Sequence, residues 1–235
     1  MSRNLFLEIT GKARSEGRKT LSFQECARLC GSYGIPIVDS GLAKNVEEAV
    51  RVAEKIGYPV ALKVESSEIL HKSDVGGVLL NITDGESLRR AYNQLVENVR
   101  KSKPGANIDG VSVSRMAKPG KELIIGANKD RTFGHVLLFG LGGIFTEVFE
   151  DFSLRVAPIY KEEALEMINE IRGAKILEGY RGTEKVDKDA LAEILMAIGR
   201  MVTENPEITS LDLNPVIGYS RGATVVDVKV VFDSQ

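Results

Sequence analysis

The feature that most constrains the fold is a change of pattern near residue 111. Before it, helical and strand patterns alternate along the chain. After it, several strand patterns follow one another, two helices come next, and the stretch from "ITSLDLNPVIGY" to "TVVDVKVVF" predicts a β-hairpin closed by "SRG". Helices are predicted at 22–34, 45–57, 84–105, 161–173 and 187–205, and strands at 35–39, 58–65, 76–83, 111–116, 121–128, 135–143 and 154–160.

This order predicts an α+β fold with two lobes. The first lobe spans 23–111 and the second 112–235, with residues 1–22 expected to pack with the second lobe. A hinge near 111–116 would leave a cleft between the lobes, where ligands usually bind.

The composition excludes several classes of protein. The 235 residues are 43% hydrophobic and 27% charged, with a net charge of -2, so nothing indicates a nucleic-acid or membrane partner. No apolar run is long enough to span a bilayer, and the N-terminus has no apolar secretion signal, so a cytoplasmic protein is expected. Cys26 and Cys30 are interpreted as small core residues.

Polar residues on the closing hairpin are candidates for a metal site. Asp212 and Asn214 are two apart in "LDLNPV", so both face the same side of a strand, and Leu211 and Leu213 face the other. Asp227 interrupts a valine-rich strand and shares its face with Lys229. Two acids and an amide offer the hard oxygen ligands that suit Mg²⁺ held mainly by nucleotide phosphates. The alternative is a solvated polar face.

Two further residues could bind a nucleotide. Lys63, near the end of the strand "ALKVES", could reach a phosphate or could be an ordinary exposed lysine. Glu122 could hold a ribose hydroxyl or pair with a lysine. "GLGG" resembles a dinucleotide fingerprint only in part, and no P-loop motif is present.

The stretch "ILHKSDVGGV" contains His71, one of two histidines in the chain. Gly76 and Gly77 permit close backbone approach and could present N–H groups to a phosphate. A neutral imidazole can act as a nucleophile or as a general acid or base. The alternative is a surface histidine in a mobile loop. His135 is predicted to be a structural histidine at a strand start, and Arg155 to bind phosphate or an acid.

Taken together, the order of motifs resembles a known family. A strand lysine is followed by "HKSDVGGV", "KELIIGANKDRTFG", "FGLGGIFTEVFEDFSLRVAP", "LDLNPV" and "VVDVK", over residues 20 to 232 or so. This order is similar to that of the ATP-grasp β subunit of ADP-forming acyl-CoA (acetyl-CoA) synthetases, which are relatives of succinyl-CoA synthetase.

The resemblance implies an ATP-grasp fold whose two lobes grip ATP or ADP, and the reaction acyl-CoA + ADP + Pi ⇌ acid + ATP + CoA. It implies that His71 carries a phosphoryl group and that Asp212 orients this histidine. The implied nucleotide contacts are Lys63, Gly76 and Gly77 at the phosphates, Arg115 and Met116 at the adenine and Glu122 at the ribose, with Asn214 and Asp227 as Mg²⁺ ligands.

The resemblance also implies a partner. The CoA-binding and acyl-phosphate sites would belong to an α subunit, in an α₂β₂ assembly. Many relatives have a glutamine–glutamate pair where this chain has Ser114 and Arg115, which affects the expected hinge and ribose contacts. Two alternatives stay open: a stand-alone ATP-grasp carboxylate ligase that works through an acyl phosphate, and a non-catalytic nucleotide-sensing subunit.

Overall fold

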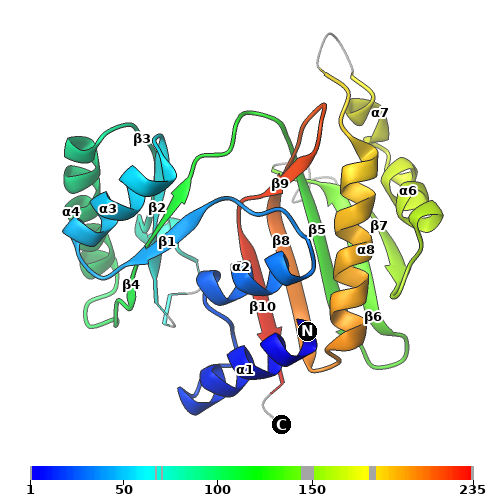
Figure 1. Ribbon diagram of the computed structural model, residues 1–235, viewed down its shortest axis with the longest axis horizontal. Helices are drawn as coiled ribbons and strands as arrows, with labels where there is room; N and C mark the ends of the chain where they lie inside the picture. The colour runs from blue at the N-terminus through cyan, green and yellow to red at the C-terminus, as the bar shows by residue number, and fades with distance from the viewer. Residues whose placement is uncertain (1, 67, 70, 144–150, 180–183, 234–235) are drawn as a thin grey trace. The chain divides into compact units, whose positions relative to one another are not determined.

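The protein consists of two compact units. The smaller unit is Val38–Lys118, and the larger unit combines Met1–Ile37 with Pro119–Gln235. The computed structural model describes residues 2–66, 68–69, 71–143, 151–179 and 184–233 (Figure 1). No helix among these residues is both long and apolar enough to cross a membrane.

The smaller unit is a four-stranded antiparallel sheet with two long helices. The strands lie in the order β1-β4-β2-β3. Asn45 and Asp84 begin the two helices, since each side chain accepts a hydrogen bond from the N–H group three residues later. The elements are β1 (Ser40–Ala43), α3 (Val46–Ile56), β2 (Val60–Glu65), the 3₁₀ turn η1 (Ser73–Val75), β3 (Val78–Ile82), α4 (Gly85–Ser102) and β4 (Gly110–Arg115).

The core of the smaller unit joins one face of this sheet to its helices. Leu62 and Val64 of β2 are fully buried and belong to the same cluster as Leu88 and Leu95 of α4. The two strand residues are two positions apart and the two helix residues are seven positions apart, as expected when one face of each element is buried. Because strand residues alternate in direction, Lys63 lies on the opposite face of β2 from this core.

Truncating the centre of this core is expected to destabilise the smaller unit. Leu62→Ala should lower its free energy of unfolding by about 2–5 kcal/mol, through lost apolar contact and a residual cavity. Leu80→Ala, on the neighbouring strand at 56% exposure, is the matched control and should cost less than about 1 kcal/mol. Urea denaturation followed by amide exchange in β2 and α4 measures both, and equal losses would contradict the assigned core.

The larger unit is built on a second antiparallel sheet, in which β10, β8, β5, β6 and β7 lie side by side in that order and β9 also pairs with β8. The long strand β8 pairs with β10 before Asn214 and with β9 after it. The elements are α1 (Ser2–Ser15), α2 (Phe23–Ser32), β5 (Lys121–Asp130), β6 (Gly134–Leu141), β7 (Phe152–Val156), α6 (Lys161–Glu170), α7 (Ala174–Leu177), α8 (Lys188–Glu204), β8 (Ile208–Gly218), β9 (Ala223–Val225) and β10 (Val228–Phe232).

The register gives this sheet a covered face and an outer face. Helix α2 contacts β10, and α8 contacts β5 and β6, on the same side of the sheet (Figure 1). The covered face carries a row of residues that are at most 1% exposed: Val230, Leu211, Ala127 and Leu137. One residue along each strand, the outer face carries the row Lys229, Asp212, Gly126 and Leu138. The outer face therefore changes from polar on β10 and β8 to apolar on β6.

Some elements differ from the sequence predictions. The predicted strand at 35–39 is reduced to one bridge between Ile37 and Val225, and the regular strand β1 starts at Ser40. The N-terminal helix α1 is not predicted, because it contains Gly11 and has no acidic residue in its first turn. Tertiary contacts stabilise it, including hydrogen bonds from Arg3 to Glu207.

The unit boundaries also differ from the predicted lobes at 23–111 and 112–235. Residues 23–37 belong to the larger unit, since α2 packs on β10 and the Val225 N–H donates to the Pro36 carbonyl at 2.8 Å. Residues 112–118 stay with the smaller unit, because β4 pairs there with both β1 and β2.

Candidate functional site

The polar residues of the closing strands lie together on the larger unit. Asp212 lies on the outer face, since its neighbours Leu211 and Leu213 are 1% and 0% exposed on the covered face. Asn214 follows two residues later and is exposed. Asp227 lies at the break between β9 and β10, where its carbonyl accepts the Asn214 N–H at 3.1 Å. The structure thus brings these three predicted residues together.

The two carboxylates on this face, Asp212 and Asp227, repel each other. Burial raises the pKa of the Asp212 carboxyl above its ordinary value, the negative charge of Asp227 raises it further, and Lys229 lowers it. A cation would relieve this repulsion, and the carboxylate and amide oxygens are ligands that suit Mg²⁺. No cluster of three or more His, Cys, Asp or Glu residues forms among the described residues. A Mg²⁺ ion on this face would therefore complete its coordination with water and phosphate oxygens.

Glu122 lies near the start of β5, beside the glycine-rich end of β6. The Gly142 N–H donates to the Glu122 carbonyl at 2.8 Å, and a Cβ at Gly142 would lie 2.9 Å from the backbone of β5. A Cβ at Gly143, where φ is +67°, would lie 3.3 Å from Oε2 of Glu122. The "GLGG" glycines therefore allow close backbone approach and leave the carboxylate accessible. The following part of the motif, residues 144–150, lies outside the described residues.

Lys63 and the glycine pair lie together in the smaller unit. Lys63 is half-buried on β2, and its cross-strand neighbours are Ser112 and Val78. Gly77 directly precedes Val78, so the loop containing Gly76 and Gly77 enters β3 beside Lys63.

The N–H groups of this glycine pair are already used within the loop. Gly76 donates to the Ser73 carbonyl at 3.0 Å, and Gly77 donates to the Lys72 carbonyl at 2.8 Å. A Cβ at Gly77 would lie 2.6 Å from Cγ1 of Val64, so no larger residue fits there. In this conformation the pair provides close approach, and donation to a phosphate would require the loop to open.

His71 is exposed between two buried anchors. Ile69 and Val75 are 3% and 8% exposed and belong to the core of the smaller unit. Lys72, the next residue, pairs with Glu65 at 2.9 Å. The imidazole is therefore presented to solvent on a short segment that is fixed on both sides, an arrangement that suits a nucleophile.

Arg115 is the last residue of β4 in the smaller unit, and Met116 follows it. The Arg115 N–H donates to the Asp39 carbonyl at 2.8 Å, and the Met116 N–H donates to the Pro59 carbonyl at 3.0 Å. The Arg115 side chain also lies 3.3 Å from the Asp39 carboxylate. An adenine contact at these residues would have to use atoms other than these two N–H groups.

The predicted residues thus fall into two groups. The smaller unit holds Lys63, His71, Gly76, Gly77, Arg115 and Met116, and the larger unit holds Glu122, Asp212, Asn214 and Asp227. Sequence reasoning missed Glu65, the partner of Lys72. The available signal was an acidic residue at the end of a mostly apolar strand, seven positions before a lysine.

Other candidates have structural roles. His135 is 8% exposed, with Nε2 at 2.7 Å from the Ile208 carbonyl, as predicted for a structural histidine. Arg155 pairs with Glu170 at 2.8 Å, so it binds an acid. Cys26 and Cys30 are free and buried, and burial raises the pKa of the Cys30 thiol to about 12.

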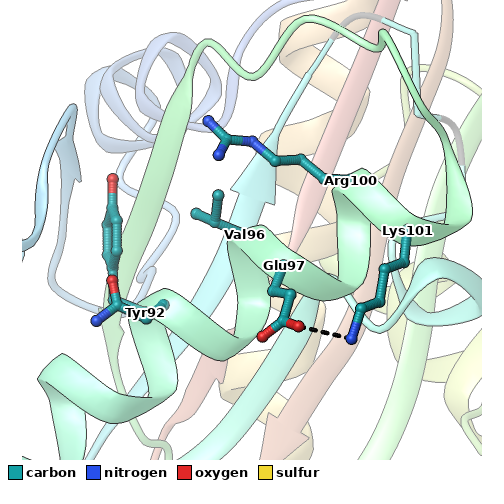
Figure 2. Close-up of a pocket in the computed structure, with 6 residues that line it drawn as sticks. Tyr92, Val96, Glu97, Arg100 and Lys101 are labelled. Atoms are coloured by element: carbon teal, nitrogen blue, oxygen red, sulfur yellow. Dashed lines mark ion pairs between the residues drawn. The ribbon is translucent and has the colours of Figure 1, made fainter.

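A shallow depression on α4 includes no predicted site residue. It is lined by Tyr92, Asn93, Val96, Glu97, Arg100 and Lys101 (Figure 2). Glu97 and Lys101 pair with each other at 2.6 Å. The depression offers neither a nucleophile nor a group of acids for a metal ion, so the candidate chemistry lies elsewhere.

Comparisons with known proteins agree with the motif order. A family model described as an ATP-grasp domain matches residues 12–232. The acetate–CoA ligase (ADP-forming) I subunit beta of Pyrococcus furiosus is 44% identical over 224 residues, 95% of this chain and 96% of that one. The acetate–CoA ligase (ADP-forming) I of Archaeoglobus fulgidus is 44% identical over 204 residues, which are 87% of this chain but 30% of that protein.

Solved structures agree as well. An acetyl-coenzyme A synthetase 1 of Ca. Korarchaeum cryptofilum, in complex with coenzyme A and Ca-AMPCP, has a TM-score of 0.94 at 46% identity, covering 99% of this chain and 100% of that one. Two further structures of that enzyme, with TM-scores of 0.90 and 0.85, cover the same shares at 44% and 42% identity. One holds a phosphorylated phosphohistidine segment in a site I orientation; in the other, with Mg-AMPPCP, the segment points towards the nucleotide binding site.

These matches confirm the predicted α+β ATP-grasp fold and the predicted family resemblance. They cover nearly the whole chain, including both groups of candidate residues. The chain therefore belongs to the ATP-grasp family and, within it, to the β subunits of ADP-forming acetate–CoA ligases.

Proposed function

We propose that this chain is the nucleotide-binding subunit of an ADP-forming acyl-CoA synthetase and that His71 carries the phosphoryl group to ADP. The observation that carries the proposal is the exposed His71, held between buried anchors on the unit that also contains Lys63 and the glycine pair. A nucleotide-sensing subunit would need no such nucleophile. We therefore favour the catalytic function over a sensing function.

The chemistry proceeds in two transfers. In the direction of ATP synthesis, a ring nitrogen of His71 attacks the phosphorus of the phosphoryl group that the partner subunit carries, forming an N–P bond as the bond from that phosphorus to the partner breaks. A β-phosphate oxygen of ADP then attacks this phosphorus, and the N–P bond breaks to regenerate neutral imidazole. Splitting one transfer between distant sites into two steps is the general advantage of covalent catalysis.

Other residues neutralise charge and orient the groups. We propose that Lys63 contacts the phosphates, Glu122 the ribose and the end of β4 at Arg115 and Met116 the adenine. Asp212 would accept a hydrogen bond from the other ring nitrogen of His71, which fixes the tautomer and stabilises the cationic phosphorylated ring. Asn214 and Asp227 would hold Mg²⁺, which supplies positive charge to the nucleotide phosphates.

The phosphoryl group has to come from a partner. The names of the relatives describe a separate subunit beta in Pyrococcus furiosus, while the Archaeoglobus fulgidus protein has this domain in 30% of a longer chain. We propose an α subunit, equivalent to the rest of that longer chain, that binds CoA and forms the acyl phosphate. The proposed assembly is α₂β₂ and cytoplasmic.

The test is phosphorylation of the purified chain by Mg²⁺ and γ-labelled ATP, mapped by mass spectrometry under non-acidic conditions. The expected result is a label on His71 that is stable in base, labile in acid and returned to ATP when ADP is added. The peptide with His135 is the internal control and should stay unlabelled. Absence of label with and without the α subunit, despite ADP binding measured by calorimetry, would overturn the proposal in favour of a sensing subunit. Acyl-phosphate formation by the isolated chain would overturn it in favour of a stand-alone ligase.

A further inference from the structure

The residue after His71 is tied to the end of β2 by its side chain and by its main chain. Nζ of Lys72 lies 2.9 Å from Oε2 of Glu65, the last residue of β2. The Lys72 carbonyl accepts the Gly77 N–H at 2.8 Å, and the Gly77 carbonyl accepts the Val64 N–H at 2.8 Å. Both connections therefore lead to the last two residues of one strand.

This ion pair is more protected from water than the others described in the smaller unit. The side chains of Lys72 and Glu65 are 25% and 16% exposed, compared with 71% and 56% for Lys101 and Glu97. The remaining pairs described in this unit involve Arg89, Arg90 and Arg115, each with both side chains at least 45% exposed. A partly buried pair is screened less by salt, so it is the best suited to hold a segment in place.

We infer that the Lys72–Glu65 ion pair is a latch that positions His71 and Lys72, and that a phosphoryl group on His71 opens it. The inference rests on the proposed function, because it takes His71 as the phosphoryl carrier. Phosphorylation adds up to about two negative charges next to Lys72 in the chain. The phosphoryl oxygens attract the ammonium and repel the Glu65 carboxylate, so both effects favour opening.

Opening has a direct use in a carrier mechanism. A carrier that serves two sites has to leave its resting position after it receives the phosphoryl group. A latch that opens in response to the added charge couples this movement to phosphorylation. Moving Lys72 also breaks its main-chain bond with Gly77, which makes the Gly77 N–H available to a phosphate. Lys72 and Glu65 are thus positioning residues that act on His71.

The test is hydrogen exchange of the peptides that contain residues 66–77, in Glu65→Gln and in the wild type. Glutamine keeps the shape of glutamate but removes its charge. We expect exchange in the unphosphorylated Glu65→Gln chain to be about fivefold faster than in the wild type. Phosphorylation should accelerate the wild type by a similar factor and Glu65→Gln by much less. Lys72→Gln should reproduce the fast exchange of Glu65→Gln.

Glu97→Gln is the matched control, since it removes an ion pair of the same unit that lies on α4 (Figure 2). It should leave exchange in residues 66–77 unchanged. Equal exchange in Glu65→Gln and the wild type before phosphorylation would overturn the latch. So would a wild-type chain that becomes labelled on His71 without any change in exchange. Failure of the proposed function is distinguishable, because it would appear as absence of phosphoryl label on His71. The comparison of unphosphorylated Glu65→Gln with the wild type would still report on the ion pair.

Discussion

Replacing His71 with alanine is expected to reduce ATP synthesis from acyl-CoA, ADP and phosphate by at least about 10⁴-fold, since the reaction loses its phosphoryl carrier. The second histidine and the two cysteines cannot replace it. His135 is buried and bonded to a carbonyl, and burial raises the pKa of both Cys26 and Cys30. Folding should change by less than about 0.5 kcal/mol, because His71 is exposed.

Half-reactions separate this loss from damage to the assembly. With the α subunit present, the His71→Ala complex should still form acyl phosphate from acyl-CoA and phosphate, because that step does not use His71. It should also bind ADP with wild-type affinity in calorimetry. Phosphoryl exchange between ATP and ADP should be lost. Retention of more than a few per cent of the overall rate would show that the phosphoryl group reaches ADP without His71.

The sequence predicted most elements of the fold because their patterns are strongly periodic. Helix α3 begins at Asn45 and ends before Gly57, as the capping pattern indicates. The alternation of Leu211 and Leu213 with Asp212 and Asn214 also indicated which side of β8 is buried. Helix α1 could not be predicted in this way, since its stability comes from distant contacts such as Arg3 with Glu207.

The candidate site was predictable in its residues but not in its contacts. Families preserve chemistry-bearing side chains in order along the chain, which is why His71 and Asp227 could be named from motifs. Hydrogen bonds within a loop depend on backbone geometry, so the sequence did not reveal that Gly76 and Gly77 use their N–H groups internally. The pairing of Glu65 with Lys72 likewise depends on how the loop returns to β2.

Replacing Asp227 with asparagine is expected to lower turnover about 10²- to 10³-fold at a fixed Mg²⁺ concentration, by weakening charge neutralisation at the phosphates. The same change should stabilise the ligand-free protein by up to about 1 kcal/mol, a small gain because water screens these partly exposed carboxylates. The reason is that Asp227 no longer repels Asp212 on the outer face. Calorimetric Mg·ADP titrations and thermal unfolding measure the two effects.

The stability gained by Asp227→Asn should depend on pH. The pKa of Asp212 is raised above its ordinary value of 3.8 in the folded protein, so the folded state holds this proton more tightly than the unfolded chain. The stability supplied by that proton is lost as pH rises from about 4 through the raised pKa. The advantage of Asp227→Asn should therefore be absent near pH 3 and appear as pH rises to neutrality.

Asp130→Asn is the matched control for this pH dependence, because it should behave in the opposite way. Backbone N–H groups of Phe133 and Thr132 lower the pKa of Asp130, so its ionised form stabilises the folded state. Its replacement should lower stability at neutral pH and lose this effect as the solution is acidified through the pKa of Asp130. If Asp227→Asn instead destabilised the ligand-free protein at neutral pH, the two carboxylates would not be in repulsion. Relief of that repulsion would then not contribute to Mg²⁺ binding on the outer face.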